Sequence, residues 1–343
     1  MAAEDSRKIE LKHGAGGRAM RALVKELFVG RFGDPSGAGI GLTAMDDGAA
    51  IPLGNQWLVV TTDSHVVSPL FFPGGDIGRL AISGTVNDLA MMGATEVLGL
   101  TFAMVVEEGF PLADLERVRD SIAVACADAE ATILTGDTKV MGHGEIDGLV
   151  LNTSGVALAQ RVVPDSGLRA GDVIILSGTA GDHGLAIMTC RHGIALDGPL
   201  ESDVAPINGM IRCALDAGGG DVIAMKDPTR GGLASALCEM AEKSGVGILL
   251  NGPAVPLTNA VRAASELLGI DPLIAASEGK ALIGVRAGAA DRVLAAMRKH
   301  PLGCGAAIVA RCVAERPGRV VLDTGFGRRI LTEPEGEPLP RIC

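Results

Sequence analysis

Hydrophobic positions in this chain follow two spacings, and together they predict an α/β protein. Apolar residues at helical spacing predict helices, whereas short apolar runs bounded by Gly, Pro or Asp predict buried strands. In the first half, the pattern predicts helices over 18–31, 76–92 and 112–129, and strands over 57–63, 94–106, 132–141 and 148–159. In the second half, it predicts strands over 172–177, 246–250, 281–286, 305–313 and 319–323, and helices over 182–193, 204–217, 231–244, 258–268 and 289–299.

The turn-rich segment 165–171 interrupts this alternation and divides the chain into two halves. A chain of 343 residues is long enough for two domains of ordinary size. We therefore expect an N-terminal domain over 1–163, a C-terminal domain over 164–325 and a flexible tail over 326–343. The tail is rich in Pro, Gly and Glu, a composition that disfavours independent folding.

Composition excludes several classes of protein. Hydrophobic residues make up 48% of the chain but aromatic residues only 2%, which predicts an aliphatic core. The net charge of −11 and the lack of basic runs and aromatic platforms argue against nucleic-acid binding. The longest apolar run, Val97 to Val106, is too short to span a bilayer. Seven cysteines without a Cys-x-x-Cys pair, and no visible secretory signal, favour a reduced cytoplasmic protein without a disulfide framework or zinc site.

Acidic residues stand at predicted strand ends and in glycine-rich turns at five separate places. The motifs are Asp46-Asp47-Gly-Ala-Ala50, Thr61-Thr-Asp63, Asn87-Asp88, Thr135-Gly-Asp137-Thr-Lys139 and Lys226-Asp227-Pro-Thr-Arg230. A helix cap or a turn explains each acid singly. Asp88 is the exception, because a carboxylate on an apolar helix needs a partner such as a metal or a base. Five acid sites without matching bases favour a shared Mg²⁺ site, with Asp46, Asp63, Asp88 and Asp227 as the expected ligands.

Two glycine-rich loops precede predicted helices and could offer backbone N–H groups to phosphates. The first loop contains Gly14, Gly16 and Gly17. It is not a Walker loop, since the Gly-Lys-Ser/Thr ending is absent, and a plain turn explains it equally well. In the second loop, Arg230 beside Asp227 is either a structural ion pair or a phosphate clamp.

The chain ends on Cys343, after the segment Glu333-Pro-Glu-Gly-Glu-Pro-Leu-Pro-Arg-Ile. No flanking chain follows to cover this cysteine, and the prolines favour an extended segment. The arrangement predicts a thiol carried on an arm, with a frayed terminus as the alternative. Glu278, between small residues at the entry to a predicted strand, is either a surface acid or a positioned base.

Taken together, these motifs resemble those of the HypE family of hydrogenase maturation factors, which make cyanide ligands. The resemblance covers the whole chain in order. The acid-rich motifs alone would indicate only the wider superfamily of aminoimidazole ribonucleotide (AIR) synthetase, selenophosphate synthetase and thiamine-phosphate kinase. The terminal Pro340-Arg-Ile-Cys343 narrows the resemblance from this superfamily to the HypE family. The matching motifs are His13-Gly-Ala-Gly-Gly17, Asp46-Asp47-Gly-Ala-Ala50, Ser83-Gly-Thr-Val-Asn-Asp-Leu-Ala-Met-Met-Gly93, Gly136-Asp-Thr-Lys-Val140, Asp227-Pro-Thr-Arg-Gly-Gly-Leu-Ala234, Ser277-Glu-Gly-Lys280 and that terminus.

The resemblance implies an α/β (α+β) fold of two AIR synthetase-like domains, in which the N-terminal domain forms an intersubunit β-barrel in a homodimer. It also implies ATP and Mg²⁺ at the acid cluster. The implied partners are HypF, which donates a carbamoyl group, and the HypC–HypD complex, which accepts cyanide. The cofactor-binding residues expected on this basis are Gly14, Gly16, Gly17, Asp46, Asp47, Asp63, Asn87, Asp88, Asp137, Asp227 and Arg230.

The implied reaction is ATP-dependent dehydration of a carbamoyl group on Cys343 to thiocyanate, which supplies cyanide for the iron centre of NiFe hydrogenase. ATP turns the carbonyl oxygen into a phosphate leaving group, and a base removes the nitrogen protons. Glu278 is the candidate base, and Lys139 is the candidate phosphate clamp or proton relay. One alternative is an ATP-dependent small-molecule kinase or synthetase of the same superfamily, which would not need the tail. Another is a non-catalytic scaffold, which would not bind nucleotide.

Overall fold

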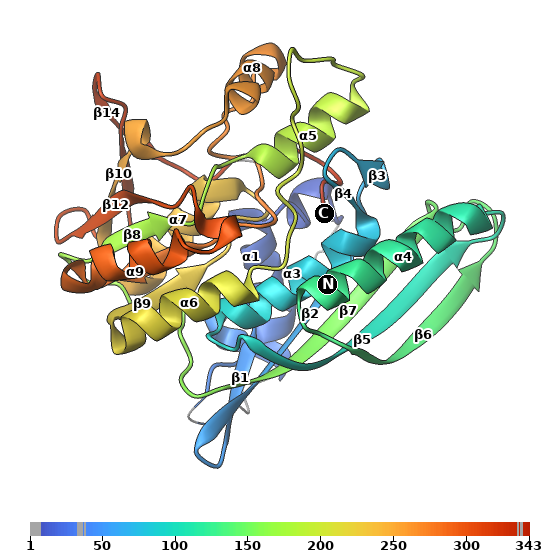
Figure 1. Cartoon of the computed structure of the whole chain (residues 1–343), viewed down its shortest axis with the longest axis horizontal. Helices are drawn as coiled ribbons and strands as arrows, with labels where there is room; N and C mark the ends of the chain where they lie inside the picture. Colours follow the sequence, from blue (N-terminus) through green and yellow to red (C-terminus); the bar gives the residue numbers. More distant parts are fainter. Residues whose placement is uncertain (1–7, 33–36, 38, 335, 337–338) are drawn as a thin grey trace, which may run out of the picture.

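Two sheets form the framework of the molecule, and each has its own helices (Figure 1). The computed structural model describes residues 8–32, 37, 39–334, 336 and 339–343. A helical N-terminal segment precedes the first sheet, and a two-stranded ribbon lies between its strands in sequence. These smaller elements are the 3₁₀ turn Leu11–His13, α1 (Arg18–Val24), a π-helical turn (Lys25–Val29), α2 (Gly30–Phe32), β3 (Phe71–Phe72) and β4 (Gly75–Asp76).

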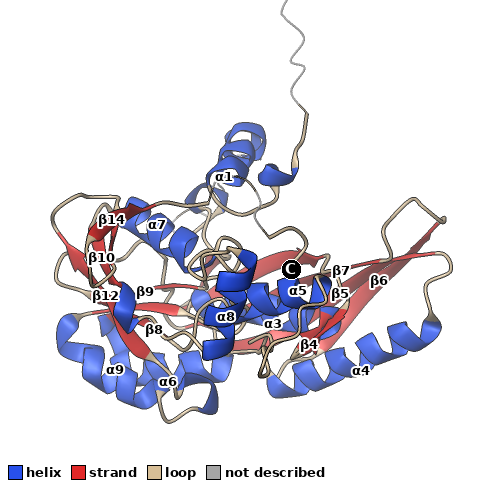
Figure 2. Cartoon of the chain, turned by 90° about the horizontal axis from the view of Figure 1, so that it is seen from above, coloured by secondary structure: helices blue, strands red, loops and turns tan. Residues whose placement is uncertain are grey.

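The first sheet has the strand order β1-β2-β7-β5-β6, and all neighbours are antiparallel except β5 and β6. Buried and half-exposed residues alternate along the whole of β7, so only one face of the sheet is covered. α3 and α4 lie along that face (Figure 2). The bounds are β1 (Ala49–Leu53), β2 (Gln56–His65), α3 (Ile77–Met91), β5 (Glu96–Glu107), α4 (Leu112–Asp128), β6 (Ile133–Met141) and β7 (Leu149–Ala159).

The second sheet has the order β14-β13-β10-β12-β8-β11-β9. α6 and α9 pack together and against its strands, while α7 packs against β9, β10 and β13. α5 and α8 lie beside each other away from the sheet. The bounds are β8 (Val173–Leu176), α5 (Asp182–Arg191), α6 (Asn208–Gly218), β9 (Val222–Lys226), α7 (Gly232–Ser244), β10 (Gly247–Asn251), α8 (Asn259–Leu268), β11 (Leu282–Val285), α9 (Ala290–Met297), β12 (Ala307–Val313), β13 (Val320–Asp323) and β14 (Arg328–Leu331).

The central helix α3 is determined by clear local signals. Asp76 caps its N-terminus by accepting hydrogen bonds from the backbone N–H groups of Gly78 and Arg79 at 2.8 and 3.0 Å. Gly93, with a φ of +87°, turns the chain after its last residues. Almost every residue of this helix is buried, so a polar side chain on it must face either a partner group or a cavity.

The core is aliphatic, as the composition predicts, and it is built mainly from Ile, Leu, Val, Ala and Met. One hydrophobic cluster includes residues from both halves of the chain and from its end. It contains Leu80 of α3, Leu185 of α5, and Leu339 and Ile342 from the last five residues. Burial of this cluster therefore joins the first sheet, the second half and the C-terminus.

Each predicted helix and strand has a counterpart, but the structure adds the short ribbon of β3 and β4 and three strands in the two larger sheets. β1 and β9 were not predicted, and β14 lies inside the segment predicted as a flexible tail. β14 pairs antiparallel with β13, so these residues belong to the second sheet rather than to a tail. α6 begins at Asn208 rather than at 204, because Pro206 disfavours helical geometry in the residue before it. The domain boundary at 163–164 stays a prediction.

None of the helices in the described residues combines the length and apolar character that a membrane span requires.

Candidate functional site

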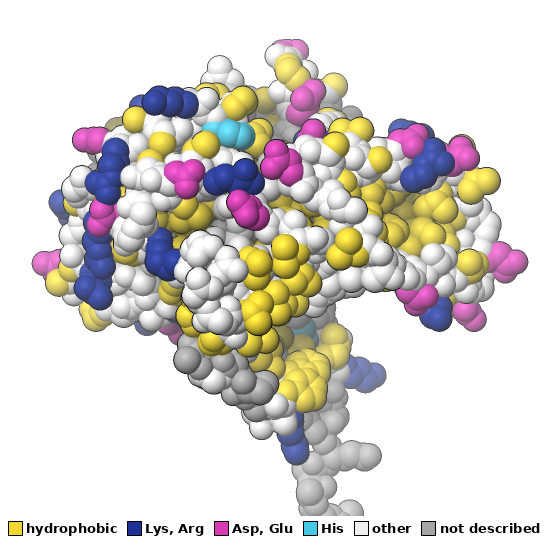
Figure 3. Space-filling model, turned by 60° about the horizontal axis from the view of Figure 1, so that its bottom comes forward, with side chains coloured by type: hydrophobic (Ala, Val, Ile, Leu, Met, Phe, Trp, Pro, Cys, Tyr) yellow, Lys and Arg dark blue, Asp and Glu magenta, His cyan; other side chains and the backbone are white. Residues whose placement is uncertain are grey.

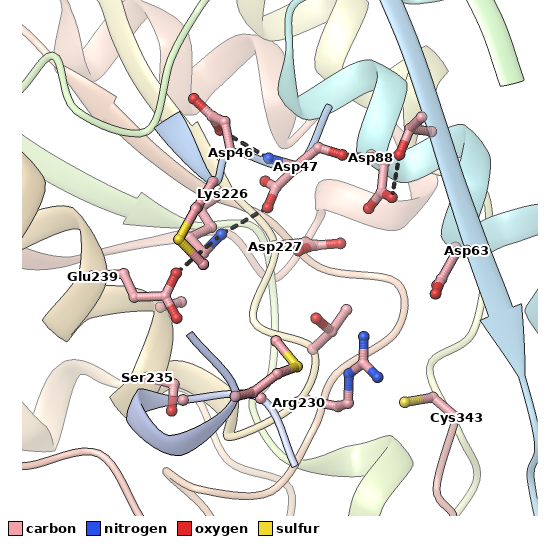
Figure 4. Close-up of a pocket in the computed structure, with 18 of the residues that line it drawn as sticks. Asp46, Asp47, Asp63, Asp88, Lys226, Asp227, Arg230, Ser235, Glu239 and Cys343 are labelled. Carbon is pink, nitrogen blue, oxygen red and sulfur yellow. Dashed lines mark hydrogen bonds and ion pairs between the residues drawn. The ribbon is translucent and has the colours of Figure 1, made fainter. Parts of the chain in front are cut away.

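A polar cavity of about 240 Å³ is lined by segments from across the whole chain (Figure 4). These segments are the glycine loop before α1, the residues before β1, the end of β2, one side of α3, the residues after β9, part of α7, the turn before β11, and the C-terminus. The predicted residues that line it are Gly16, Gly17, Asp46, Asp47, Asp63, Asp88, Asp227, Arg230, Glu278 and Cys343. The fold thus brings most of the predicted site together, although Gly14, Asn87, Asp137 and Lys139 do not line this cavity.

Asp88 is the polar residue of α3 that faces the cavity. Its Oδ2 lies 2.9 Å from the Thr61 hydroxyl, which donates a hydrogen bond to it. Burial, followed by the charges of Asp227, Asp63 and Asp47, raises the pKa of Asp88 well above its usual value. Asp88 is therefore a carboxyl group whose charge the folded chain does not neutralise by itself.

Two further carboxyl groups of the cavity, Asp46 and Asp227, also have raised pKa values, whereas the pKa of Asp63 is lowered because the hydrogen bond and charge of His65 outweigh its burial. Burial raises the pKa of Asp46 to about 7, and the nearby charges of Asp165 and Asp47 add to that effect. Burial and then Asp47 raise the pKa of Asp227 to about 8. Such shifts arise where several carboxylates share a site with too few cations. The cavity is therefore suited to a bound cation.

Lys226 is a cation of this site that the sequence analysis did not assign to it. Its Nζ lies 2.6 Å from Asp47 Oδ1, 3.5 Å from Glu239 Oε2 and 3.7 Å from Asp165 Oδ2. Burial lowers the pKa of Lys226, but these acids outweigh burial and raise it well above the usual value. Lys226 ends β9, so recognising that strand in the sequence would have placed the lysine beside Asp227 at the edge of a sheet.

The carboxylates fit a divalent cation that arrives with phosphate. Asp47 Oδ2 is buried and has no hydrogen-bond partner among the described residues. Within the residues that the structure describes, no group of three or more His, Cys, Asp or Glu side chains is arranged to hold a metal ion by itself. Mg²⁺ commonly takes one or two carboxylates and completes its coordination with phosphate and water. The site therefore suits an ion shared with a nucleotide.

Mg²⁺ is expected to raise the melting temperature of the protein more at about pH 8.5 than at about pH 6. In the folded chain the pKa values of Asp46 and Asp227 are about 7 and about 8, above the roughly 3.9 of an unfolded Asp. These groups stabilise the metal-free fold at low pH, and that contribution is lost as pH rises through about 7 and 8. Because Mg²⁺ binds the ionised form, its stabilising effect grows over the same range. Melting curves with and without Mg²⁺ check this, and equal shifts at both pH values would contradict it.

Glu278 is buried, and its turn is held from both sides. Its backbone N–H donates to Asp203 Oδ1 at 3.0 Å, and its carbonyl accepts from Asn87 Nδ2 at 3.0 Å. Lys280 pairs with the same Asp203 at 2.9 Å. Burial and then the charges of Asp227 and other acids raise the pKa of Glu278 well above its usual value. A carboxylate in such surroundings has the high proton affinity that a general base needs.

Asn87 supports Glu278 from inside the fold. Besides its bond to Glu278, its Nδ2 donates to the Ala205 carbonyl at 3.1 Å, and its Oδ1 accepts from the Ile207 N–H at 2.9 Å. Both amide donors are therefore used within the chain, and this leaves Asn87 as a support of the site rather than part of the cavity wall. Gly14 likewise lies off the cavity, where its N–H closes the turn to Leu11 at 2.9 Å.

Arg230 faces the C-terminus across the cavity. Figure 4 shows the Cys343 sulfur directed toward the Arg230 side chain. The negative charge at Cys343, followed by that of Asp63, raises the pKa of Arg230 above its usual range despite burial. The glycine loop packs directly on this arginine, since a Cβ on Gly16 would lie 2.7 Å from Arg230 Cβ, and the φ of Gly16 is +72°.

The structure places Cys343 inside the cavity and not at the end of an extended arm. The expectation of an extended arm is wrong for this conformation, because Leu339 and Ile342 are each only 4% exposed, while Cys343 itself is half-buried. Burial of two aliphatic side chains outweighs the extended tendency of the prolines. The predicted thiol therefore shares one cavity with the acids, Arg230 and Glu278.

Lys139 and Asp137 lie on β6, away from the cavity. Lys139 is opposite Val105 and Asp137 is opposite Ala103 in the parallel pairing with β5. The side chains of both are about 70% exposed and lie 3.9 Å apart. Within one chain, neither residue reaches Cys343, so their predicted roles are not served by this subunit's own cavity.

The chain matches the family described as AIR synthase related protein, N-terminal domain, over residues 45–159, and the corresponding C-terminal domain family over residues 169–323. The fold and the site thus define a two-domain protein of mixed α/β AIR synthase-like class. The carbamoyl dehydratase HypE of Bradyrhizobium diazoefficiens is 46% identical over 98% of this chain and 96% of its own length.

Two solved structures are similar to this chain and support the same family. A HypE–HypF complex contains a chain with a TM-score of 0.84 and 40% identity, which covers 91% of this chain and 100% of that one. HypE in complex with ATP gives a TM-score of 0.81 and 38% identity, and covers 98% of this chain and 100% of that one. The chain belongs to the HypE family of carbamoyl dehydratases, the hydrogenase maturation proteins.

Proposed function

We propose that this chain uses ATP to dehydrate a carbamoyl group carried on its own Cys343 to a thiocyanate, which then supplies cyanide for the iron centre of NiFe hydrogenase. The observation that carries the proposal is that Cys343 lies in one cavity with Arg230, Glu278 and the aspartate cluster. A scaffold that only presented its tail would have no reason to place a thiol beside buried carboxylates. A kinase or synthetase for a free small molecule would not need its C-terminus there.

The reaction balances with the residues present. The Cys343 thiol becomes a thiocarbamate, S–C(=O)–NH₂, when HypF delivers the carbamoyl group. The carbonyl oxygen then takes the γ-phosphoryl group of ATP, and loss of phosphate with both nitrogen protons leaves S–C≡N. Glu278 is the proposed base for these protons, and its raised pKa suits that task. Arg230 is proposed to neutralise charge that develops on the transferred phosphoryl group.

The proposed ATP site is the cavity wall made by the glycine loop and the aspartates. Gly16 and Gly17 would face phosphate. Asp46, Asp63, Asp88 and Asp227 are the candidate ligands, of which one or two would hold Mg²⁺ together with phosphate oxygens and water. The ion would neutralise phosphate charge. The solved relative that binds ATP supports this assignment. The relative solved with HypF supports HypF as the carbamoyl donor, and the HypC–HypD complex is the acceptor we propose for the cyanide.

Intact-mass measurement tests this function. The chain is incubated with HypF and a carbamoyl donor, first without and then with Mg-ATP. We expect the thiocarbamate to accumulate in the first step and to lose one water in the second. A thiocarbamate that persists with Mg-ATP would contradict the proposal. Normal ATP turnover by a chain truncated before Pro340 would favour the small-molecule kinase or synthetase instead.

Asp88→Asn is expected to weaken Mg-ATP binding by about tenfold to a hundredfold while keeping the fold. The substitution removes a carboxylate from the acidic cluster, where burial and neighbouring acids raise the pKa of Asp88 and where a bound cation would offset the negative charge. Isothermal titration calorimetry with Mg²⁺ present measures the change. Asp120→Asn, on the exposed side of α4, is the matched control and should leave affinity unchanged. Equal affinities of the Asp88 variant and the control would remove Asp88 from the metal site.

We also propose the homodimer with an intersubunit β-barrel that the family resemblance implies. The support is the face of the first sheet opposite α3 and α4, which none of the helices in the described part of the chain covers, together with apolar side chains along β5 and β6. Leu98, Leu134 and Val140 are 54%, 68% and 68% exposed. Figure 3, which brings the underside of the molecule forward, shows groups of hydrophobic side chains at the surface. If the barrel closes against a second copy of the chain, Lys139 and Asp137 would lie in a site shared between the two subunits.

Leu134→Glu is expected to weaken self-association about tenfold or more, because it places a charge in the apolar surface proposed to be buried. Sedimentation velocity over a range of protein concentrations measures the effect. Val124→Glu, at a 56% exposed position on α4, is the control and should not change the association. A chain that sediments as a monomer at every concentration would exclude the barrel.

A further inference from the structure

The last residues of the chain are bound through their backbone. Three successive carbonyl groups, those of Pro340, Arg341 and Ile342, each accept at least one hydrogen bond from residues elsewhere in the fold. Because backbone carbonyls are recognised, the contact sets the register of the chain and the place of the residue that follows. That residue is Cys343.

Arg191, the last residue of α5, makes most of these contacts. Its guanidinium donates to the Pro340 carbonyl at 2.7 Å and to the Arg341 carbonyl at 2.9 Å. It also donates twice to the Ser68 carbonyl, at 3.0 and 2.6 Å, which fixes its orientation. The Ser68 N–H in turn donates to the Arg341 carbonyl at 3.1 Å. A planar guanidinium with five donors is suited to gather several carbonyls in this way.

His183, near the start of the same helix, binds the next carbonyl. Its Nε2 lies 2.6 Å from the Ile342 oxygen, and its Nδ1 lies 2.7 Å from the Ser202 hydroxyl. The Ser202 oxygen accepts from the Val204 N–H at 3.1 Å, so its own hydrogen is available for Nδ1. This arrangement assigns the imidazole hydrogen to Nε2, which donates it to Ile342. Burial lowers the pKa of His183, in keeping with a neutral ring.

Side-chain packing completes the docked conformation. Leu339 and Ile342 are buried, and Gly184 makes room for Leu339, since a Cβ there would lie 3.3 Å from Leu339 Cδ1. Arg341 has a φ of +54°, in the left-handed region, and the chain turns there toward the cavity. A non-glycine residue adopts this conformation when its surroundings determine it, and here the bound Arg341 carbonyl does so.

We propose that Arg191 and His183 are positioning residues for the dehydration step, which bind the tail backbone and thereby place the carbamoylated Cys343 in the cavity. The inference rests on the proposed function for its chemical readout. Both residues act through the backbone before Cys343 and are not catalytic residues. The bonds to the tail are non-covalent, so the tail can leave the cavity to meet HypF and return to the same register.

The test uses Arg191→Met, which keeps much of the side-chain volume and removes all donors. Arg191→Lys can restore part of the contact, and Arg262→Met, at an exposed position on α8, is the control. Trypsin cleavage after Arg341 reports the tail directly, because docking protects a carbonyl that is bound by two partners. Intact mass follows loss of the Ile342-Cys343 dipeptide in the full-length chain.

We expect cleavage of Arg191→Met to be about 10- to 100-fold faster than that of wild type, with Arg191→Lys between the two and the control unchanged. Single-turnover dehydration, started by Mg-ATP from the purified thiocarbamate, should slow by a similar factor. Acceptance of the carbamoyl group from HypF and ATP affinity should both stay as in wild type. His183→Gln, whose amide can still donate to the Ile342 carbonyl, should slow dehydration less than His183→Leu does.

Unchanged cleavage in Arg191→Met would overturn the docking role, and faster cleavage with unchanged dehydration would overturn the positioning role. Loss of ATP binding in Arg191→Met would show a general structural defect and would also count against the positioning role. Failure of the proposed function is distinguishable from these outcomes. In that case wild type would form no thiocyanate, while the cleavage assay would still report whether Arg191 holds the tail.

Discussion

Glu278→Gln is expected to accept the carbamoyl group at the normal rate and then to stall before dehydration. The amide has nearly the same shape as the carboxylate but cannot take a proton from the thiocarbamate nitrogen. Loss of a general base costs about 100- to 10,000-fold in rate. The thiocarbamate should therefore accumulate under conditions in which wild type converts it to thiocyanate, and intact mass separates the two states by one water.

The backbone contacts of this turn do not depend on the Glu278 side chain, so the substitution tests the carboxylate alone. Asp203 and Asn87 hold the N–H and carbonyl of Glu278, so the side-chain change leaves the turn in place. Glu266→Gln, at an exposed position on α8, is the matched control and should dehydrate normally. Normal thiocyanate formation in Glu278→Gln would leave Lys139, from a second subunit, or a water molecule as the base.

Cys343→Ala is expected to abolish both adducts completely while ATP still binds. The side chain that carries the carbamoyl group is removed, whereas the glycine loop and the aspartates are untouched. Cys190→Ala, which changes an exposed cysteine on α5, should behave as wild type. Intact mass and calorimetry measure the two properties. A dehydrated adduct on the Cys343 variant would exclude the terminal thiol as the carrier.

Much of the fold was predictable because its cause is local. Apolar spacing and turn residues predict α3, α4 and strands β2, β5, β6 and β7 of the first sheet, and two acids of the cavity, Asp63 and Asp88, lie on those elements. β14 could not be predicted, since Arg328–Leu331 carries no strong strand pattern and is ordered by pairing with β13. Lys226 was missed for a similar reason, because it becomes part of the site only when β9 takes its place beside β11.

The C-terminus shows the limit of sequence reasoning more clearly. A segment rich in Pro, Gly and Glu gives no local reason to expect order, and the thiol was expected on an extended arm. Order comes from distant residues, since Arg191 and His183 bind the backbone and the hydrophobic cluster takes up Leu339 and Ile342. Such contacts depend on how α5 packs in the finished fold. The same limit applies to Lys139, whose proposed role would depend on a second subunit.

The most direct measurement of the central claim follows the carbonyl oxygen of the thiocarbamate. The chain is charged through HypF with a carbamoyl group that carries heavy oxygen, then given Mg-ATP in ordinary water. If ATP activates that oxygen as a leaving group, the released inorganic phosphate should contain one heavy oxygen for each thiocyanate formed on Cys343. Heavy oxygen that appears in water, with unlabelled phosphate, would contradict ATP-dependent dehydration by this chain.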